Sequence, residues 1–407
     1  MKVVRIFSFL LLFIATLSIG IFAGRKSIDL TKPAVPIYPV NEGTIALKPG
    51  PWGNLTCLPI TIAAPTELLN VRRTEENPVR WFLKGFTVPK LNDLLNSSGL
   101  SDSQRSRLLA SDKLEISTNG LTLNPDRDLV FDLSPEAIGK LYRILAIAGE
   151  NDYLKEIFPA SKFEKIIKTD GISDKTILLL KRVSFKYGKY YFCYCLPYVL
   201  SSIPTYEEKH LLMKEISRQN TMLVKLWVAP NSDYNSLADY WCRACWSTDV
   251  KAILESLAKT PGGGVLDIVE LLPPLATAQL YTFPVPPNPL NGPAVRQDCM
   301  WTSFNFFRDT PSSKFNDSNY LLECLKSDYY LVKSDPRYGD IVVFSTPDSR
   351  FIHSAVFIAD NIVFTKNSDN PLIPWTFSTI DELLDIYSIN VLPEEKLTLY
   401  YFRNKYY

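Results

Sequence analysis

The stretch that decides the fold of this chain lies near its C-terminus, where residues 353–367 read HSAVFIADNIVFTKN. Two runs of β-branched and aromatic residues flank Asp360-Asn361, a dipeptide that favours a turn. The stretch therefore predicts a β-hairpin, with His353 at the outer end of its first strand. Residues 341–344, which precede the hairpin, are fully apolar and predict another strand.

The register of this hairpin decides which side chain of the second strand faces His353. Because side chains alternate between the two faces of a strand, an odd-length loop would place Thr365 and Asn367 beside His353, whereas a two-residue loop would place Lys366 there. Asn367 is the predicted partner, because an amide can orient an imidazole in a Cys-His-Asn arrangement.

Cys299 is the candidate nucleophile for such a histidine. Apolar residues recur at helical spacing after Asp298-Cys299, so the cysteine is expected in the first turn of a buried helix. The free N–H groups and the positive dipole of a helix N-terminus lower the pKa of a thiol and can hold an oxyanion. The pattern predicts acyl transfer with Cys299 as nucleophile and His353 as base.

Residues 292–405 resemble the NlpC-type papain-like cysteine peptidases. The resemblance rests on three features: Asp298-Cys299 opening a helix, Gly339-Asp340 leading a strand, and His353 before a hairpin turn. It implies a papain-like core, in which a helix packs on a small antiparallel sheet. It also implies that Cys299 and His353 hydrolyse an amide bond in the stem peptides of bacterial peptidoglycan.

A rival interpretation starts from two departures from that family. Met300 and Trp301 stand where the family usually has a small residue and a glycine, and the second histidine that is often the third polar residue is absent. In this interpretation Met300 and Trp301 fill the old cleft. The module then serves as a catalytically inactive binding or structural unit of the cell envelope.

The N-terminus predicts export. Lys2 and Arg5 precede an uncharged, mostly apolar run that ends at Ala23, so residues 1–23 are typical of a signal peptide or of an uncleaved membrane anchor. Both alternatives place the rest of the protein outside the cytoplasm, in the periplasm or beyond, and a retained anchor would hold it at the inner membrane. The proline-rich residues 24–50 are expected to form a linker.

A second proline-rich segment, residues 284–293, is the predicted boundary of the last domain, residues 294–407. Residues 51–283 are expected to be mostly helical, so the predicted fold class is α+β. Three strand candidates lie in this region: residues 176–185, 189–196 and 221–228.

Two helices in this region have clear start signals. One begins at Pro135 after an N-cap at Ser134, and the other begins near Thr248. Residues 133–142 around the first helix share Leu, Pro, Ala, Leu and Tyr with residues 272–281. This echo favours a tandem duplication, with units of about residues 51–150 and 221–283, over a coincidence of common residues.

The balance of charges limits the kinds of partner that the chain is expected to bind. The 44 basic and 43 acidic residues nearly cancel, so no nucleic-acid partner is expected. The expected partner is peptidoglycan or another peptide substrate, with membrane contact only through the N-terminal anchor.

The seven cysteines predict a free Cys299 and up to three disulfides among the others. Cys193-Tyr-Cys195 and Cys242-Arg-Ala-Cys245 resemble halves of a zinc site, but the gap between them favours disulfides or buried thiols. No metal or organic cofactor is expected.

Overall fold

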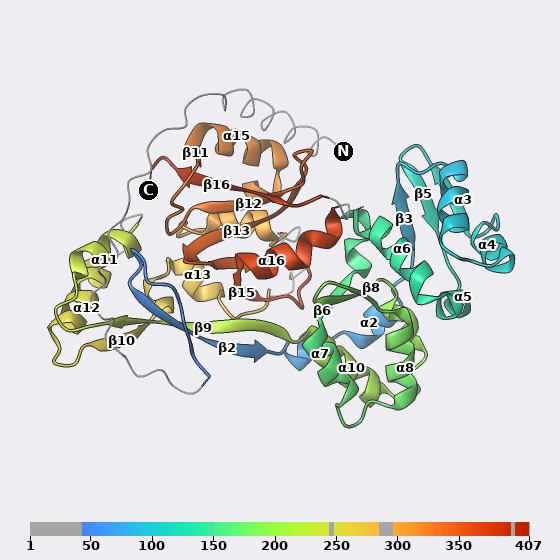
Figure 1. Cartoon of the computed structure of the whole chain (residues 1–407), viewed down its shortest axis with the longest axis horizontal. Coiled ribbons are helices and arrows are strands. Elements are labelled where there is room, and N and C mark those ends of the chain that lie inside the picture. The colour runs from blue at the N-terminus through green and yellow to red at the C-terminus, as the bar shows by residue number, and fades with distance from the viewer. Residues whose placement is uncertain (1–42, 148, 244–247, 285–295, 392–394, 407) are drawn as a thin grey trace. The chain divides into compact units, whose positions relative to one another are not determined.

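The computed structural model describes residues 43–147, 149–243, 248–284, 296–391 and 395–406 (Figure 1). It is 43% helical and 25% strand with small antiparallel sheets, which confirms the α+β class. The chain forms two compact units. Unit 1 takes the chain up to Ile62, Gln219–Leu383 and the chain from Glu395, and unit 2 takes Ala63–Arg218 and Leu384–Glu394.

Unit 1 contains a six-stranded antiparallel sheet that carries the candidate site. In spatial order its strands are β11 (Tyr329–Val332), β16 (Thr398–Asn404), β12 (Ile341–Ser345), β13 (Phe351–Ala359), β14 (Ile362–Lys366) and β15 (Trp375–Thr379). The predicted hairpin is therefore confirmed as β13 and β14. Helix α14 (Cys299–Asn305) packs on these two strands. Every residue of β12 and β14 is buried, so both faces of the sheet centre are covered.

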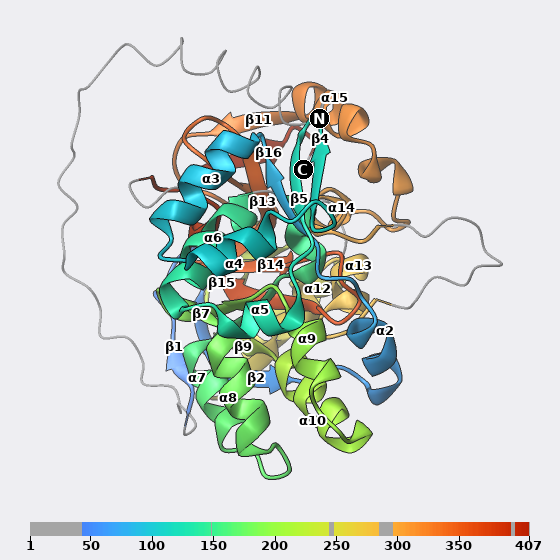
Figure 2. The same ribbon diagram turned by 90° about the vertical axis from the view of Figure 1, so that its right-hand side faces the viewer.

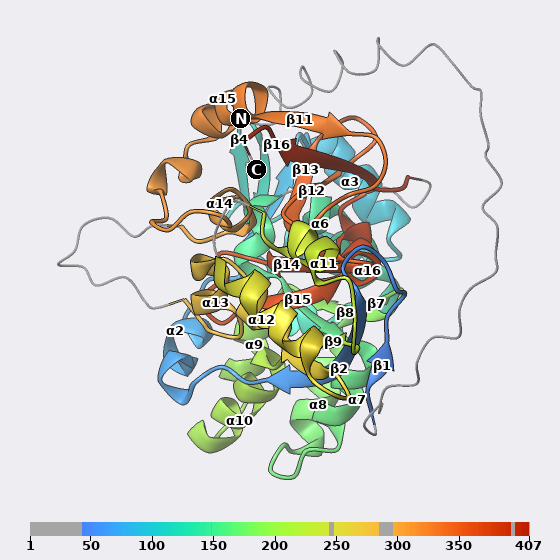
Figure 3. The ribbon, with the colours of Figure 1, turned by 90° about the vertical axis from the view of Figure 1, so that its left-hand side faces the viewer.

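A second antiparallel sheet of unit 1 contains β1 (Ile45–Ala46), β2 (Asn54–Ile62), β9 (Gln219–Val228) and β10 (Gly264–Asp267). Figure 3 shows helices α11 (Tyr234–Trp241) and α12 (Thr248–Lys259) beside these strands. Unit 1 also contains the α-helices α13 (Pro274–Gln279) and α15 (Ser318–Asp328) and the 3₁₀ helices η3 (Ile268–Leu271) and η5 (Ser313–Asn316). Helix α16 (Ile380–Tyr387) and η6 (Ser388–Asn390) follow β15.

The proline-rich boundary does not separate two compact units. One hydrophobic core contains Val224 of β9, Trp301 of α14 and Phe364 of β14. The Thr221 hydroxyl donates to the Phe377 carbonyl at 2.9 Å and accepts from the Phe377 N–H at 3.1 Å. Residues 219–284 therefore fold with the C-terminal part, because their strands and helices complete its core. Residues 285–295 lie outside the described part of the chain.

Unit 2 contains two small antiparallel sheets and most of the helices (Figure 2). The sheets are β3 (Trp81–Lys84), β5 (Gly120–Leu123) and β4 (Leu114–Ser117), and β6 (Glu156–Pro159), β8 (Tyr190–Cys193) and β7 (Phe185–Tyr187). The helices are η1 (Thr66–Leu68), α2 (Val71–Glu75), α3 (Val88–Ser97), α4 (Asp102–Leu108), α5 (Arg127–Asp132), α6 (Pro135–Ile147), η2 (Gly149–Leu154), α7 (Ala160–Ile167), α8 (Asp174–Val183), α9 (Leu196–Ser201) and α10 (Tyr206–Ser217).

The predicted helices at Pro135 and Thr248 are confirmed as α6 and α12, and the hydroxyl of Ser134 accepts from the Ala137 N–H. The strand at 221–228 is confirmed as β9, and β8 lies inside the candidate at 189–196.

The strand predicted at 176–185 is wrong, because residues 174–183 form helix α8. Ser173 caps this helix by accepting from the Thr176 N–H, and the buried Thr176, Leu180 and Val183 recur at helical spacing. The β-branched composition of the segment concealed that periodicity.

The tandem duplication finds no support in the order of elements. Trp81 lies in strand β3, whereas Trp241 ends helix α11. The two echo helices, α6 and α13, differ in length, at 13 and 6 residues, and belong to different units. The region 51–283 also carries strands β2 to β10 beside its helices.

The predicted export segment, residues 1–23, and the linker up to residue 42 lie outside the described residues. Within the described ranges, no helix has the length and apolar character that crossing a membrane requires.

Candidate functional site

Cys299 lies where the sequence predicts, as the first residue of helix α14. Asp298 is the N-cap, and its Oδ1 accepts a hydrogen bond from the Trp301 N–H at 2.9 Å. An aspartate at this position satisfies one of the free N–H groups that begin every helix, and its charge suits the helix dipole. The cysteine is half-buried.

The surroundings of the Cys299 thiol disfavour its ionisation. Burial raises its pKa to about 12, and the neighbouring carboxylate of Asp298 raises it further. The backbone N–H and the hydroxyl of Ser354 lie within hydrogen-bond reach of the sulfur and favour the thiolate, but they do not outweigh these effects. The expectation of a lowered pKa is therefore wrong, because burial disfavours the thiolate and the Asp298 carboxylate that caps the helix adds a negative charge beside the sulfur.

His353 is buried on strand β13. Its side chain is 1% exposed, and Nε2 lies 2.8 Å from the hydroxyl oxygen of Thr365. The hydroxyl of Thr365 also donates to Oδ1 of Asn367 at 3.3 Å. The imidazole ring lies beside that of Phe344, with 5.7 Å between the ring centroids. These contacts hold the imidazole within the protein rather than toward solvent.

The faces of β13 separate the two predicted catalytic side chains. Ser354 faces α14, because its hydroxyl oxygen lies 3.0 Å from that of Ser303 and 3.6 Å from the sulfur of Met300. Strands β12 and β13 pair His353 opposite Phe344 and Ser354 opposite Val343, and their register shifts only beyond this point, between Phe344 and Ser345. Adjacent side chains of a regular strand point to opposite faces. His353 therefore faces away from the helix that carries Cys299.

A β-bulge settles the partner of His353. The turn at Asp360-Asn361 has two residues, since Ala359 pairs with Ile362, but the register shifts between Phe357 and Ala359. After this shift Val356 pairs with Phe364. Before the turn, the strands therefore pair as they would if the loop had an odd number of residues.

Thr365 consequently lies on the His353 face, and Lys366 lies on the other. Thr365 shares a hydrogen bond with Nε2 of His353, and its hydroxyl donates to Asn367. The sequence had favoured Asn367 as the direct partner.

Lys366 lies on the α14 face and is fully buried. Its ammonium donates to the carbonyl oxygens of Ser368 and Asn370 and lies 5.5 Å from the centroid of the Trp375 ring. Burial lowers the pKa of Lys366 to about 8, although the negative charges of Asp369 and Asp298 oppose this shift. Lys366 is thus the ionisable base on the same side of the sheet as Cys299.

Charged residues form a rim over this side of the sheet. Nε of Arg296 lies 2.9 Å from a carboxylate oxygen of Asp369 and 3.3 Å from one of Asp298. Arg296 and Asp369 are both at least half exposed. Burial raises the pKa of Asp298, partly offset by its hydrogen bond from the Trp301 N–H. The rim offers both signs of charge to a ligand.

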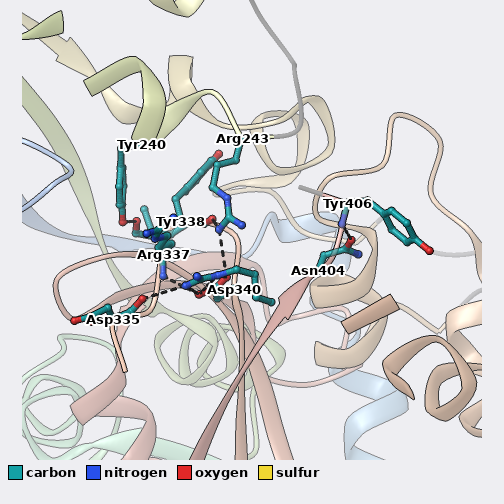
Figure 4. Close-up of polar contacts among 10 residues, drawn as sticks. Tyr240, Arg243, Asp335, Arg337, Tyr338, Asp340, Asn404 and Tyr406 are labelled. Atoms are coloured by element: carbon teal, nitrogen blue, oxygen red, sulfur yellow. Dashed lines mark hydrogen bonds and ion pairs between the residues drawn. The ribbon is translucent and has the colours of Figure 1, made fainter. Parts of the chain in front are cut away.

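Asp340, predicted to support the site, is a structural anchor (Figure 4). Its buried carboxylate accepts from Nε and Nη2 of Arg403, from Nη1 of Arg243 and from the Arg337 N–H. The backbone carbonyl of Asp340 also accepts from the Phe357 N–H at 2.8 Å. These bonds fix the turn before β12 to β16 and to the end of α11.

The sequence did not predict several residues that contact the candidate site residues and the elements that carry them. Ser303 and Ser354 meet between helix and sheet, and a polar residue in the apolar run after His353 was the available signal for this contact. Nothing in the sequence indicates that Arg243 and Arg403 contact Asp340, because they lie 97 and 63 residues away from it along the chain.

The described cysteines do not form the expected disulfides. Cys57, Cys193, Cys195, Cys299 and Cys324 carry thiols. Cys245 lies outside the described residues, and the sequence left a disulfide and two buried thiols as alternatives for Cys242 and Cys245.

Comparison of the chain with models of known protein families, with curated proteins and with solved structures finds no match. The resemblance to NlpC-type peptidases therefore rests on the sequence motifs alone.

Proposed function

We propose that this chain is an exported cell-envelope protein whose papain-like module binds peptide without hydrolysing it through Cys299 and His353. One observation carries the proposal: Ser354 faces the helix of Cys299, so the adjacent His353 faces away from it. A base must come within hydrogen-bond reach of the proton that it removes. An imidazole on the opposite face of the sheet does not meet this requirement.

The protonation state of the thiol supports the same conclusion. The nucleophile in cysteine catalysis is the thiolate, and the pKa of Cys299 is raised to about 12 by burial and by Asp298. Near neutral pH this thiol therefore keeps its proton. His353 cannot take the proton, because its ring is buried against Phe344 and hydrogen-bonded to Thr365.

The proposed ligand follows from the charges above α14. Arg296 can pair with a carboxylate of a ligand, and Asp298 and Asp369 can accept from an ammonium group. Peptides of the bacterial cell wall carry both groups, and they are the partner that the NlpC resemblance implies. The proposed ligand is accordingly the stem peptide of peptidoglycan.

The test uses the purified full chain and purified peptidoglycan sacculi. The protein is sedimented with the sacculi, and the supernatant is analysed for peptide fragments by mass. We expect co-sedimentation that Arg296→Ala weakens and that the exposed Arg127→Ala, in unit 2, leaves unchanged. We also expect no fragment beyond those of a protein-free blank. Loss of co-sedimentation in both variants or in neither would contradict the proposed site.

A cysteine hydrolase is the second candidate, favoured by the position of Cys299. The thiol is half-buried at the first turn of α14, where helix N–H groups can stabilise an oxyanion. This candidate requires new peptide fragments in the same assay, and it requires that Cys299→Ala abolish them while leaving co-sedimentation intact. The two candidates therefore predict opposite results in this assay: new peptide fragments for the hydrolase and none for the binding protein.

A further inference from the structure

Two cysteines of unit 2 lie together in its core, away from the candidate site. Cys193 is the last residue of strand β8, and Cys195 is the N-cap of helix α9. Both side chains are 0% exposed. The short segment between strand and helix therefore holds two thiols within one buried pocket.

The contacts of these thiols are specific. The neighbouring thiol of Cys195, together with burial, raises the pKa of Cys193. The hydroxyl oxygen of Tyr142, on helix α6, lies 3.1 Å from the sulfur of Cys195. The carboxyl group of Glu156, opposite Cys193 in the sheet, also favours the protonated thiol.

We propose that Cys193 and Cys195 are a redox site that closes to a reversible disulfide. The proposal rests on the proposed export of the chain but not on peptide binding or hydrolysis by unit 1, because every residue it uses belongs to unit 2. Cys193 and Cys195 are separated by a single residue and are both buried in the same core, so a small movement would bring their sulfur atoms together, and the proposed export would expose the chain to disulfide oxidants. The sequence alone left a structural disulfide and two buried thiols as alternatives for such pairs.

The reaction is a thiol–disulfide exchange with a small disulfide such as oxidised glutathione. The first protein sulfur attacks the small disulfide, which forms a mixed disulfide and releases one glutathione thiolate; that thiolate takes the proton of the attacking thiol. The second protein sulfur then attacks the protein sulfur of the mixed disulfide and releases the second glutathione, again with its proton. The protein loses two hydrogen atoms, and the oxidant becomes two thiols.

Burial sets the rate of this exchange. Neither sulfur is accessible in the folded state, so the oxidant reaches it only when the start of α9 opens locally. The raised pKa of Cys193 also keeps the thiolate fraction small near neutral pH. We therefore expect slow oxidation that quickens with rising pH and with mild destabilisation of unit 2.

Digestion with trypsin gives a direct test on the full chain, because residues 190–209 form one tryptic peptide with these two cysteines and no other. The native protein is treated with oxidised glutathione, freed of it, denatured and alkylated. We expect this peptide to be lighter by two hydrogen atoms and to carry no alkyl group. The tryptic peptide of residues 315–326 is an internal control, since it holds only the single thiol of Cys324 and should be alkylated.

Two further samples keep the test decisive. Reduction with dithiothreitol before denaturation should restore both alkyl groups, and Cys193→Ser should leave Cys195 fully alkylated or joined to glutathione. The proposal is overturned if the wild-type peptide carries two alkyl groups after oxidation, or if it carries glutathione on both sulfurs. It is equally overturned if the disulfide forms only when the oxidant is added to denatured protein.

Discussion

Arg403 and Asp340 form a two-point ion pair inside unit 1, with Nε and Nη2 of the arginine 2.9 and 2.7 Å from the carboxylate. The Asp340 side chain is 1% exposed and that of Arg403 is 13% exposed. The hydrogen bonds to Asp340 raise the pKa of Arg403. The pair joins β16, near the C-terminus, to the turn that opens β12.

This ion pair predicts a large loss of stability in Arg403→Gln. Removing one partner of a buried pair leaves an uncompensated charge and costs about 3–5 kcal/mol. The matched control is Lys259→Gln, because Lys259 pairs with Glu255 on the exposed surface of the same unit, so its loss should change stability far less. Denaturant unfolding measures both, and equal losses would show that Asp340 is not an anchor.

Arg243 should matter less than Arg403. Its Nη1 makes one contact with Asp340, at 3.2 Å, and a second with the carbonyl of Tyr338 at 2.7 Å. Arg243→Gln therefore removes one contact to the carboxylate where Arg403→Gln removes two. We expect the ranking Arg403 above Arg243 in the same unfolding experiment.

The reactivity of Cys299 is predicted to follow its raised pKa. Below a pKa of about 12 the thiolate fraction grows tenfold for each pH unit, so the rate of alkylation by iodoacetamide should grow in the same way from pH 7 to pH 10. Asp298→Asn keeps a good helix cap but removes the negative charge, so it should speed the reaction. The measurement is incorporation of the label at Cys299 by mass spectrometry.

His353→Ala provides the discriminating control for this prediction. The imidazole lies on the other face of β13, so the variant should alkylate Cys299 at the wild-type rate if it stays folded. A fast reaction at pH 7 that His353→Ala abolishes would instead establish an activated pair, and it would favour the hydrolase. Thermal unfolding of the variant confirms that the comparison is between folded proteins.

The sequence predicts the site's elements better than their mutual orientation. Local patterns located the hairpin around Asp360-Asn361 and the helix that begins at Cys299, because turn propensity and helical periodicity act over a few residues. Which face of β13 the helix covers depends on contacts such as Ser303 with Ser354, 51 residues apart. No short-range pattern encodes that choice, so periodicity alone could not show whether Cys299 and His353 lie on the same face of the sheet.

The domain boundary failed for a related reason. The prolines between residues 284 and 293 break regular structure locally, but they do not prevent the chain on either side from sharing a core. Trp375 lies on a strand after this segment, and its carbonyl accepts from the Tyr281 N–H before it. A break in secondary structure is therefore weak evidence for a division between folding units.

Lys366 should make the stability of unit 1 depend on pH. Its pKa is about 8 in the folded chain, against 10.5 for an ordinary lysine, because burial disfavours the ammonium. Between these values the unfolded chain binds the proton that the folded chain has lost, so the stability contribution of Lys366 rises with pH. Below pH 8 both states are protonated and the contribution is at its lowest.

The measurement is the difference in unfolding free energy between the wild type and Lys366→Met. We expect this difference to shift in favour of the wild type by roughly 3 kcal/mol between pH 8 and pH 10.5. Taking the difference removes the titration of groups that both proteins share, including Cys299. A difference that stays constant with pH would show that the Lys366 ammonium keeps its ordinary pKa despite burial.

Gly339 and Gly262 offer a matched pair that separates backbone strain from crowding. Both glycines have φ of +87°, a conformation that costs other residues about 1–2 kcal/mol. A Cβ at Gly339 would lie 2.2 Å from two ring carbons of Phe307, whereas a Cβ at Gly262 would meet nothing within 4 Å. Phe307 is a buried ring of the main core, so it cannot move aside without disturbing its neighbours.

Gly262→Ala should therefore cost only the strain, about 1–2 kcal/mol, and Gly339→Ala should cost about 1–3 kcal/mol more. Denaturant unfolding of unit 1 gives both values, since the two residues belong to the same unit. The double variant Gly339→Ala, Phe307→Ala tests the cause, because removing the ring should abolish the extra cost of the alanine. If the two single variants lose equal stability, the Phe307 ring does not crowd the turn before Asp340, and the predicted extra cost of Gly339→Ala is wrong.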